Sequence, residues 1–470
     1  MGNIAQFELH DIGYVEEDAY GVTPANPTWL ELWHNASSLV PKRTTLQSRR
    51  KLGNRQRPLP RLGKKRVDGN IDSELAFAAF DDWLEALFGG RFPSSAFTQV
   101  AGITLAAVAS SQTITDSGSG LTDVEVGDWI IVAGFAAANN NGVFHVSAAA
   151  AGAITVEYGT TLTDESAGAS VTVDQQLRLE AGSDGNEGFT DISGTTIAAV
   201  AGTQTITDSG SGFGDVEVGD WVVVAGFAAS NNNGIFEVTA AAAGVITVAS
   251  GSTLTDESAT PTITITQKLD RSFSVIGRYK DQAIYHLFKG VMTKTGTFTV
   301  VPDDISKVSL GLLGADFDKD ATAPSGLTSP GVYEPFDALS GSFTEDGSAV
   351  CMTNLALTVE NNNGLADKCL GTTVAGEQFR GGFDISGTIK FYFKDNTHIT
   401  KFWEESAIAI VFTLSDPDGN QYTFGLPSCK LTELDLPKGE SDVEAEEGYN
   451  LTAGEDPITG VTVYLIKTAA

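Results

Sequence analysis

The segment VDGNIDSELAFAAFDDWLEALFGG, residues 67–90, predicts a strand that runs directly into an amphipathic helix. Ile71, Ser73 and Leu75 alternate as the residues on one face of a strand do. An apolar stripe at helical spacing follows, made of Phe77, Phe80, Trp83, Leu84, Leu87 and Phe88. Gly89-Gly90 closes the stripe where a C-terminal glycine is favoured. We expect a short helix that covers a β-sheet, and core packing explains its aromatic residues better than a ligand site does.

The same order of elements occurs twice along the chain. In the first half a strand-like segment, WLELWH (residues 29–34), precedes a long polar loop, the helix above, and the segments SFSVIGRY (272–279) and AIYHLFKGVMTKTGTFTV (283–300). In the second half the corresponding segments are NLALTVENN (354–362), FDISGTIKFYFKDNTHITKFWEES (383–406), AIAIVFTLSDPDG (407–419) and NQYTFGLPSCKLTELDLP (420–437). A strand, a short helix and a hairpin are therefore predicted in each half. DPDG is interpreted as a hairpin turn and not as a calcium loop, because the remaining ligands do not follow in register.

An internal repeat with an offset of 92 residues lies between these segments. Of the 55 positions from Gln112 to Ser166, 43 are identical in the segment from Gln204 to Ser258. Each copy predicts short strands, in the first copy at 113–115, 129–133, 143–147, 154–156 and 171–173. Asn141-Gly142 and Asn233-Gly234 favour two-residue hairpin turns. The glycine-serine stretches at Gly118 and Gly210 precede neither a helix nor a lysine, so they are interpreted as turns and not as phosphate loops.

These patterns define the expected fold class, which is mainly β with two tandem β-sandwich or β-barrel domains, each flanked by a short helix. Residues 1–98 and 267–318 form the first, discontinuous domain in this interpretation, and residues 319–470 form the second. Two small all-β modules, residues 100–174 and 192–266, are inserted in the first domain. Two copies are too few for a self-stacking solenoid, so each module is expected to fold by itself.

Composition excludes several classes of protein. The 470 residues include 60 acidic and 29 basic ones, a net charge of -31, which argues against a protein whose whole surface binds nucleic acid. Residues 100–173 and 192–266 each carry seven acidic residues and no lysine or arginine. Three cysteines, Cys351, Cys369 and Cys429, are too few for a disulfide framework and favour synthesis in a reducing cytoplasm. No targeting segment and no apolar run of spanning length is found, so we expect no membrane insertion.

The charges are also unevenly distributed along the chain. The loop from residue 42 to residue 66 contains no acidic residue and eleven basic ones: Lys42, Arg43, Arg49, Arg50, Lys51, Arg55, Arg57, Arg61, Lys64, Lys65 and Arg66. It lacks the aromatic residues of a stacking nucleic-acid arm, so we expect an extended arm that makes assembly contacts with an acidic partner surface. Direct DNA contact and a solvated loop are the alternatives. An acidic segment near the carboxyl end consists of Glu433, Asp435, Glu440, Asp442, Glu444, Glu446 and Glu447. It is interpreted as a solvated linker, as a channel wall, or as the surface that receives the basic arm.

No constellation for catalysis is present in the sequence. The five histidines are isolated, and no Walker loop, GxSxG elbow or CxxC pair occurs. We therefore predict that the protein is not an enzyme and has no catalytic, cofactor-binding or metal site.

The order YGVTPANP (residues 20–27), WLELWH, FDDWLEALFGG, SFSVIGRY and YHLFKGVMTKTGTF resembles the major tail tube proteins of long-tailed, siphovirus-type bacteriophages. LALTVENN, GTIKFYF, IAIVFTLSDPDGNQYTFGLP and the terminal strand VTVYLIK (461–467) resemble a second copy of that fold. The resemblance implies subunits whose inner strands join into rings, which stack through the long loop 42–66 into a virion tail tube for DNA ejection. With two copies per chain, a trimeric ring with pseudo-sixfold symmetry is favoured and a hexamer is the alternative. It further implies assembly in the host cytoplasm with tape measure, tail tip and terminator proteins, while genomic DNA passes without specific binding.

The remaining hypotheses concern the channel and the modules. A lumen lined with acidic residues would repel DNA, whereas a basic lumen would bind it. The modules are interpreted as passive outward decoration, or as weak adhesion sites that use Phe135, Phe227 or the asparagine runs; the alternative for both phenylalanines is core packing. The rival class for the whole chain is a modular β-rich surface adhesin or tail fibre component. This class explains the repeat modules but not the repeated order of elements in the rest of the chain.

Overall fold

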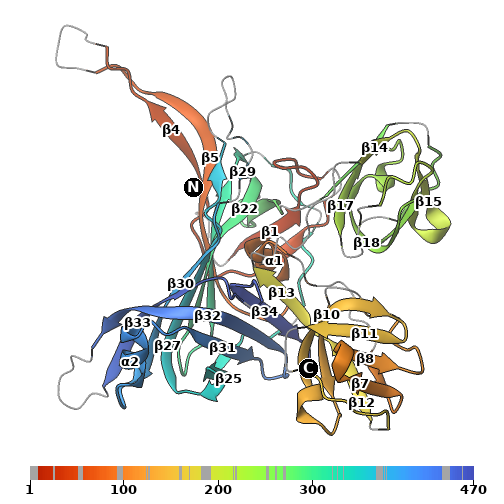
Figure 1. Ribbon diagram of the computed structural model, residues 1–470. Coiled ribbons are helices and arrows are strands. Elements are labelled where there is room, and N and C mark those ends of the chain that lie inside the picture. The colour runs from red at the N-terminus through yellow and green to blue at the C-terminus, as the bar shows by residue number, and fades with distance from the viewer. Residues whose placement is uncertain are drawn as a thin grey trace.

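The computed structural model describes most of the chain (Figure 1). It covers residues 9–24, 27–50, 57–90, 92, 99–122, 124, 128–157, 161–168, 170–181, 192–214, 216, 220–249, 253–259, 262–267, 271–319, 321–324, 326–331, 333–366, 374, 376, 378–379, 381–436, 445–457 and 459–470. The described fold is mainly β, as predicted, and a large sheet system forms its body. A narrow hairpin arm extends from one side of this body and two small modules lie on the other side.

The elements from the first half of the sequence form a set of antiparallel strands with one helix. They are β1 (His10–Glu16), β2 (Leu30–Leu32), β3 (Ala36–Ser37), β4 (Val40–Leu46), β5 (Arg61–Glu74), α1 (Asp81–Phe88), β21 (Phe273–Tyr279), β22 (Ile284–Val300), β23 (Lys307–Gly314) and β24 (Asp316–Asp318). The pairing order is β1, β21, β22, β23, β5 and then β3 and β4, and β24 also pairs with β22. The predicted helix ends at Gly89, whose φ of 81° is left-handed and suits glycine.

The elements from the second half repeat this order of pairing. They are β25 (Asp337–Glu345), β26 (Ser348–Ala349), β27 (Met352–Glu360), β28 (Gly364–Leu365), β29 (Gln378–Phe379), β30 (Asp384–Tyr392), α2 (Thr397–Trp403), β31 (Ile408–Ser415), β32 (Gln421–Asp435), β33 (Glu446–Ala453) and β34 (Val463–Thr468). The pairing order is β25, β31, β32, β33, β30 and β27, and β34 also pairs with β32. Antiparallel pairing of β22 with β27 joins the two sets into one sheet system.

One hydrophobic core serves both sets of strands. Alternate residues of β22, Gly296, Phe298 and Val300, face this core, and Leu87 of α1 packs against Gly296. The buried hydroxyl of Tyr422 in β32 accepts a hydrogen bond of 3.0 Å from the backbone N–H of Ala78 and donates one to Asp81 at the start of α1. The helix of the first set is thereby fixed to a strand of the second.

Each repeat folds into a seven-stranded sheet with its own apolar core. The first contains β6 (Val100–Gly102), β7 (Leu105–Val108), β8 (Thr113–Asp116), β9 (Trp129–Ala133), β10 (Gly142–Ala150), β11 (Ala153–Glu157) and β12 (Val171–Gln175). The second contains β14 (Ile192–Gly194), β15 (Ile197–Val200), β16 (Thr205–Asp208), β17 (Trp221–Ala225), β18 (Gly234–Ala242), β19 (Val245–Ala249) and β20 (Ile263–Gln267). The predicted strands of the first copy are confirmed within a few residues.

Local turn chemistry confirms one set of turn predictions and corrects another. Asp116 accepts hydrogen bonds from the backbone N–H groups of Gly118 (2.9 Å) and Gly120 (2.6 Å), as expected of a turn, and Asp208 does the same in the second copy. The Asn141-Gly142 prediction is wrong. β9 ends at Ala133 and β10 begins at Gly142, so a longer loop that contains a 3₁₀ turn connects them, and the corresponding loop of the second copy is the same.

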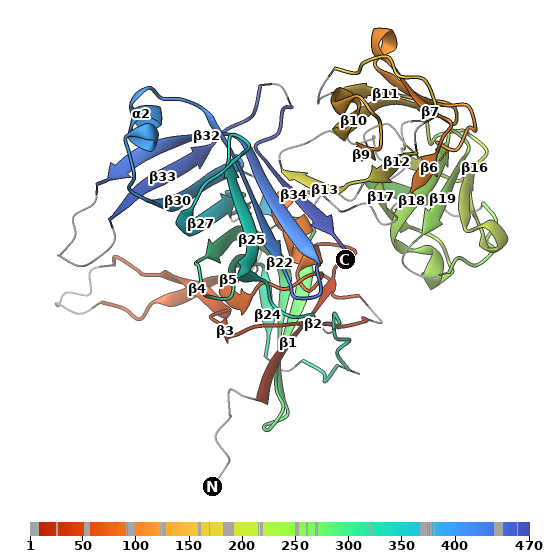
Figure 2. The same ribbon diagram turned by 90° about the horizontal axis from the view of Figure 1, so that it is seen from below.

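Between the two modules the chain returns to the body of the molecule. β13 (Leu177–Ala181) pairs antiparallel with the last strand, β34. The guanidinium carbon of Arg178 lies 3.7 Å from the ring centroid of Trp129 in the first module and 4.0 Å from that of Tyr464 in β34. An arginine stacked between two aromatic rings thus anchors the first module to the body. Figure 2 shows the place where β13 and β34 lie side by side.

Candidate assembly surfaces

In the described parts of the basic segment, residues 42–46 and 61–66 form two paired strands where the sequence predicts a loop. Lys42 pairs with Arg66 and Arg43 with Lys65 across β4 and β5, so like charges face each other along an exposed two-stranded arm. Leu46, Leu59 and Leu62 are also exposed on it, with Leu59 at 91%. At the base of the arm, Lys42 Nζ lies 3.0 Å from Asp68 Oδ2 and Lys65 Nζ lies 3.1 Å from Asp316 Oδ1.

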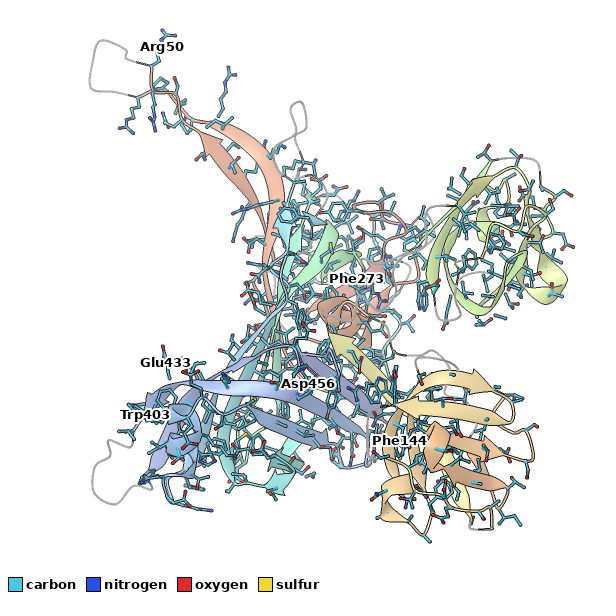
Figure 3. All side chains as sticks on the ribbon, in the orientation of Figure 1. Arg50, Phe144, Phe273, Trp403, Glu433 and Asp456 are labelled. Atoms are coloured by element: carbon cyan, nitrogen blue, oxygen red, sulfur yellow. The ribbon has the colours of Figure 1, made fainter. Side chains whose placement is uncertain are left out.

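Nine of the eleven basic residues can be placed, because Lys51 and Arg55 lie outside the described residues. The charged tip, which includes Arg50, projects away from the body (Figure 3). Exposed cations and leucines together suit a contact with an acidic and partly apolar protein surface.

The acidic segment is divided between two strands. Glu433 and Asp435 are exposed at the end of β32, and Glu446 lies at the start of β33. Glu440, Asp442 and Glu444 lie outside the described residues. Glu447 is only 1% exposed and its carboxylate bonds inside the chain, so its interpretation as a partner-contacting or lumen-facing residue is wrong.

Glu447 belongs to a cluster that holds α2 on the sheet. His398 Nδ1 lies 2.7 Å from Glu447 Oε1 and His398 Nε2 lies 3.2 Å from Glu345 Oε2. The imidazole stacks on Phe391 at 4.1 Å, and Lys401 Nζ lies 3.2 Å from Glu345 Oε1. Burial alone would lower the pKa of His398, but hydrogen bonds to Glu345 and Glu447 outweigh it and raise the pKa above its usual 6.5.

The face of the sheet opposite to the core is polar and has an excess of acidic residues. Thr295, Thr297 and Thr299 of β22 alternate with buried residues and point to this face. The acidic side chains that share it by the same alternation are Asp68, Asp72, Glu74, Glu360, Asp384, Glu433, Asp435 and Glu446. The basic ones on the same strands include Lys64, Arg66, Lys307, Lys390 and Lys430. This polar face repels polyanions more than it attracts them.

Two strand edges at this sheet pair with no other described strand. β4 pairs with β5 on one edge, and no strand among the described residues pairs with its other edge. β32 pairs with β31 up to Cys429, and no described strand continues along that edge from Lys430 onward. Open edges of this kind are sites at which another chain can add a strand.

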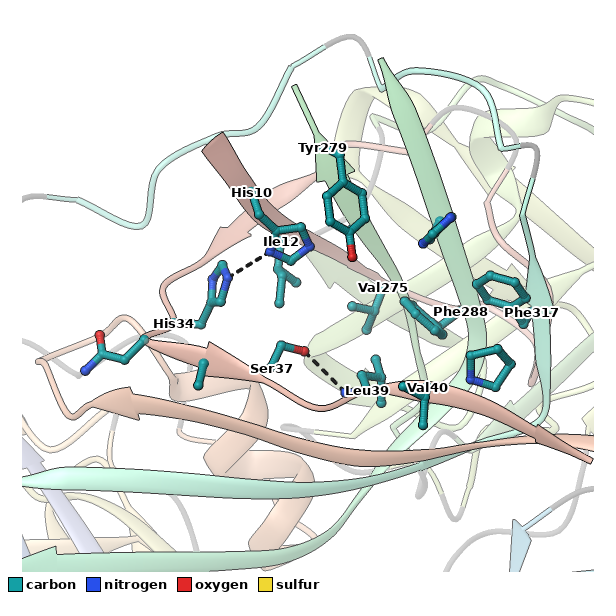
Figure 4. Close-up of a pocket in the computed structure, with 15 residues that line it drawn as sticks. His10, Ile12, His34, Ser37, Leu39, Val40, Val275, Tyr279, Phe288 and Phe317 are labelled. Atoms are coloured by element: carbon teal, nitrogen blue, oxygen red, sulfur yellow. Dashed lines mark hydrogen bonds between the residues drawn. The ribbon is translucent and has the colours of Figure 1, made fainter. Parts of the chain in front are cut away.

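A cavity of about 900 Å³ lies between the base of β4 and the strands β1, β21 and β22 (Figure 4). His10 Nδ1 lies 3.2 Å from His34 Nε2 at its wall, and His286 lines it as well. Burial lowers the pKa of all three histidines. Within the described part of the chain, no group of three or more histidine, cysteine or carboxylate side chains is arranged to hold a metal ion. The same residues include no helix with the length and apolar character that crossing a membrane requires.

The two phenylalanines and the central asparagine of each run lie in the interior of the modules, whereas Asn139 is exposed. Phe135 and Phe227 are each only 6% exposed and pack in the module cores. Asn140 and Asn232 are fully buried, and each donates a hydrogen bond of 3.0 Å to a glutamate of its own module. The core-packing interpretation of the phenylalanines is therefore confirmed, and these side chains are not available to a ligand.

Sequence reasoning missed the Arg178 stack and the His398 cluster. The aromatic residues at positions 129 and 464 were visible, but only the return of the chain at β13 brings them to the arginine. His398, Glu345 and Glu447 come from three distant segments, and the register of β30 with β33 brings two of these segments together.

Comparison with known families agrees with this arrangement. The family model described as phage tail tube protein matches residues 9–458. The chain therefore belongs to the phage tail tube protein family, a structural family of the virion tail. No curated protein matches the chain.

Proposed function

We propose that this protein is the major tail tube subunit of a siphovirus-type phage and assembles into stacked rings around a channel for the genome. The observation that carries the proposal is the antiparallel pairing of β22 with β27, which continues one sheet from the first set of strands into the second. The open edges of β4 and β32 allow the same sheet to continue into neighbouring copies.

The two sets of strands are proposed to be copies of one fold, with residues 1–98 and 267–318 in the first domain and 319–470 in the second. Their identical order of pairing supports this division. Three chains would then close a ring of six equivalent units, and six chains are the alternative. A closed ring of this kind also removes the exposed strand edges of the single chain.

The polar face is proposed to line the channel. DNA carries one negative charge per about 1.7 Å of helix axis, so a basic wall would bind it and slow its passage. Threonine, serine and excess carboxylate side chains on the polar face fit a wall that DNA crosses without specific binding.

Both modules are proposed to project outward as decorations. They are joined to the body beyond α1 and at β13, and α1 packs on the core face of β22, opposite to the polar face. Residues 100–174 and 192–266 are accordingly proposed as separate modules outside the tube wall.

The tip of the basic arm, which projects away from the body, is proposed to contact an acidic surface of the next ring. The tube is proposed to be assembled in the host cytoplasm with tape measure, tail tip and terminator proteins, as tail tube proteins are.

Electron microscopy of the purified protein over a range of concentrations, with mass measurement, tests the proposal. Hollow rings or tubes with outward knobs are expected, with three chains per ring. Compact assemblies without a channel would contradict it.

A further inference from the structure

The end of β32 is equivalent to the part of β22 that pairs with β27, but no described strand of the single chain pairs with it there. On one edge β22 pairs first with β21 and then with β27. On the equivalent edge β32 pairs first with β31, and beyond Cys429 no described strand follows. The place that β27 takes against β22 is therefore vacant against β32 in the described residues.

Two irregularities fix which residues of β22 and β32 are equivalent. In β22, the pairing with β21 has a register shift next to Val291, which pairs with Phe273. The pairing of β22 with β23 has a second shift just before Thr295, which pairs with Gly311 and lies four residues after Val291. In β32, the pairing with β31 has a register shift next to Cys429, which pairs with Ile408. The pairing of β32 with β33 has a second shift just before Glu433, which pairs with Asn450 and lies four residues after Cys429. Glu433 therefore occupies the position of Thr295.

Two glycines fix the equivalence of β4 and β27 in the same way. Gly387 of β30 pairs with Leu357 of β27 and, on its other side, with Leu451 of β33. Gly69 of β5 pairs with Leu312 of β23 and, because the registers of β3 and β4 are continuous, faces Leu39. A Cβ atom on Gly69 would lie 2.6 Å from the Cα atom of Leu39, which confirms how closely the two backbones approach.

The equivalences predict the register of the open junction. Glu360, three residues after Leu357, pairs with Thr295. Lys42 lies three residues after Leu39 and is therefore placed opposite Glu433 of a second copy.

Apolar contacts agree with this register. Phe298 is 1% exposed and pairs with Leu357 across the closed junction. Leu436 takes the position of Phe298 and is 47% exposed in the single chain. In the predicted register it comes to lie opposite Leu39, so pairing would cover it.

The charges at the two junctions are reversed. At the closed junction the cation is on the β22 side and the anion on β27, with Lys294 Nζ 3.8 Å from Glu360 Oε1. At the open junction the anion Glu433 is on β32 and the cation Lys42 is on β4. Lys42 also contacts Asp68, but that pair is exposed and an ammonium group has three donors, so it can contact both carboxylates.

We propose, resting on the proposed function, that β4 of one copy adds antiparallel to the end of β32 in a second copy with Lys42 opposite Glu433, and that the reversed charges keep this junction from exchanging with the β22–β27 junction. A β27 strand placed on β32 would bring Glu360 against Glu433. A β4 strand placed on β22 would bring Lys42 against Lys294. Like charges in direct opposition disfavour both wrong pairings.

Disulfide cross-linking in assembled protein tests the register. The background is Cys351→Ser with Cys369→Ser; Cys429 stays, because it is buried and burial raises the pKa of its thiol to about 12. Lys42→Cys with Glu433→Cys should give covalent chains of two and three subunits on oxidation. Thr44→Cys with Glu433→Cys, shifted by two residues, is the matched control and should link much less. Stronger linkage in the control would overturn the register.

Charge reversal tests the role of the ion pair. Lys42→Glu should raise the protein concentration needed for assembly about tenfold or more, and adding Glu433→Lys should restore much of the loss. Lys394→Glu, an exposed charge change elsewhere, should have little effect. Thermal unfolding of each variant shows whether it is folded. A folded Lys42→Glu variant that assembles normally would overturn the charge role.

Ring assembly and the pairing of β4 with β32 are contradicted by different results. If the unmodified chain forms no rings, the proposed function fails and this pairing fails with it. If rings form but Lys42→Cys and Glu433→Cys do not link across subunits, only the pairing is overturned.

Discussion

At the scale of single residues, the hydroxyl of Tyr422 illustrates how the two sets of strands are held together. It is fully buried, accepts from the Ala78 backbone and donates to Asp81, which also forms an ion pair with Lys467. When a buried polar group loses its hydrogen-bond partner, the free energy of unfolding falls by more than a surface hydrogen bond contributes, because water cannot replace the buried partner.

Tyr422→Phe should therefore lower the free energy of unfolding by about 1–3 kcal/mol, because the Ala78 N–H loses its acceptor. Denaturant unfolding of the unassembled chain measures this loss. Tyr285→Phe, a half-buried tyrosine of β22 away from this junction, is the control and should change it by less than about 0.5 kcal/mol. Equal effects of the two substitutions would show that the Tyr422 hydroxyl has no special role.

Arg178 anchors the first module through a planar stack that lysine cannot reproduce. Arg178→Lys should speed amide hydrogen exchange in β13 and β34 several-fold and leave the core of the first module unchanged. Arg57→Lys, an exposed position on the arm, is the control. Unaltered exchange in both strands would contradict the anchoring role.

At the scale of elements, α2 is attached to the sheet by a pH-dependent contact. The pKa of His398 is raised in the folded chain, so protonation stabilises the fold. This contribution is fully present below the unfolded pKa of about 6.5 and is lost as the pH rises through the higher folded pKa.

His398→Gln should consequently destabilise the chain by about 1–3 kcal/mol at pH 6 and by clearly less at pH 9. Denaturant unfolding at both pH values gives the comparison. His145→Gln, which changes the histidine beside Glu157 in the first module, serves as the control. A difference between variant and parent that is the same at pH 6 and pH 9 would contradict the contribution of the charged imidazole.

The elements also show what could be predicted from sequence. The strands of the first module bury one face each, so apolar alternation predicts them within a few residues. The apolar stripe predicts helix α1 less well, because Phe77 and Phe80 lie before its start at Asp81. The arm formed by β4 and the first residues of β5 buries little on either face, so its sequence has no apolar period and predicts a loop. β13 lies between the two modules and its partner β34 is almost 300 residues away, so nothing local in the sequence indicates their pairing.

For the candidate contact residues, the sequence predicts the charge but not the exposure of each side chain. A run of eleven cations and a run of carboxylates are visible in sequence as charge, but the pairing of strands decides which of them are exposed. Glu447 is turned into the core side of β33 while its neighbour Glu446 faces the polar side, because successive residues of a strand point to opposite faces.

At the scale of the whole molecule, the proposed function treats the two modules as additions to a body that folds and assembles without them. Removing residues 100–174 or residues 192–266, with a short glycine-serine linker in each case, should leave tube assembly intact and remove the outward knobs. Each deletion retains β13, which covers the edge of β34. Electron microscopy of the deleted chains checks this, and loss of the tubes would contradict a purely decorative role.

A deletion of residues 100–266 should behave differently from the two shorter deletions. It removes β13 with the modules and leaves the edge of β34 uncovered. We expect it to lower stability and assembly, in contrast to the two shorter deletions. Equal behaviour of all three would show that β13 contributes nothing to the body.

The most direct test of the central claim is a cryo-electron microscopy reconstruction of the assembled protein. The account predicts a hollow tube in which each ring contains three chains, the polar face lines the channel, and the sheet continues from β32 of one chain into β4 of the next. A channel lined by the modules, or rings in which neighbouring chains share no continuous sheet, would contradict it.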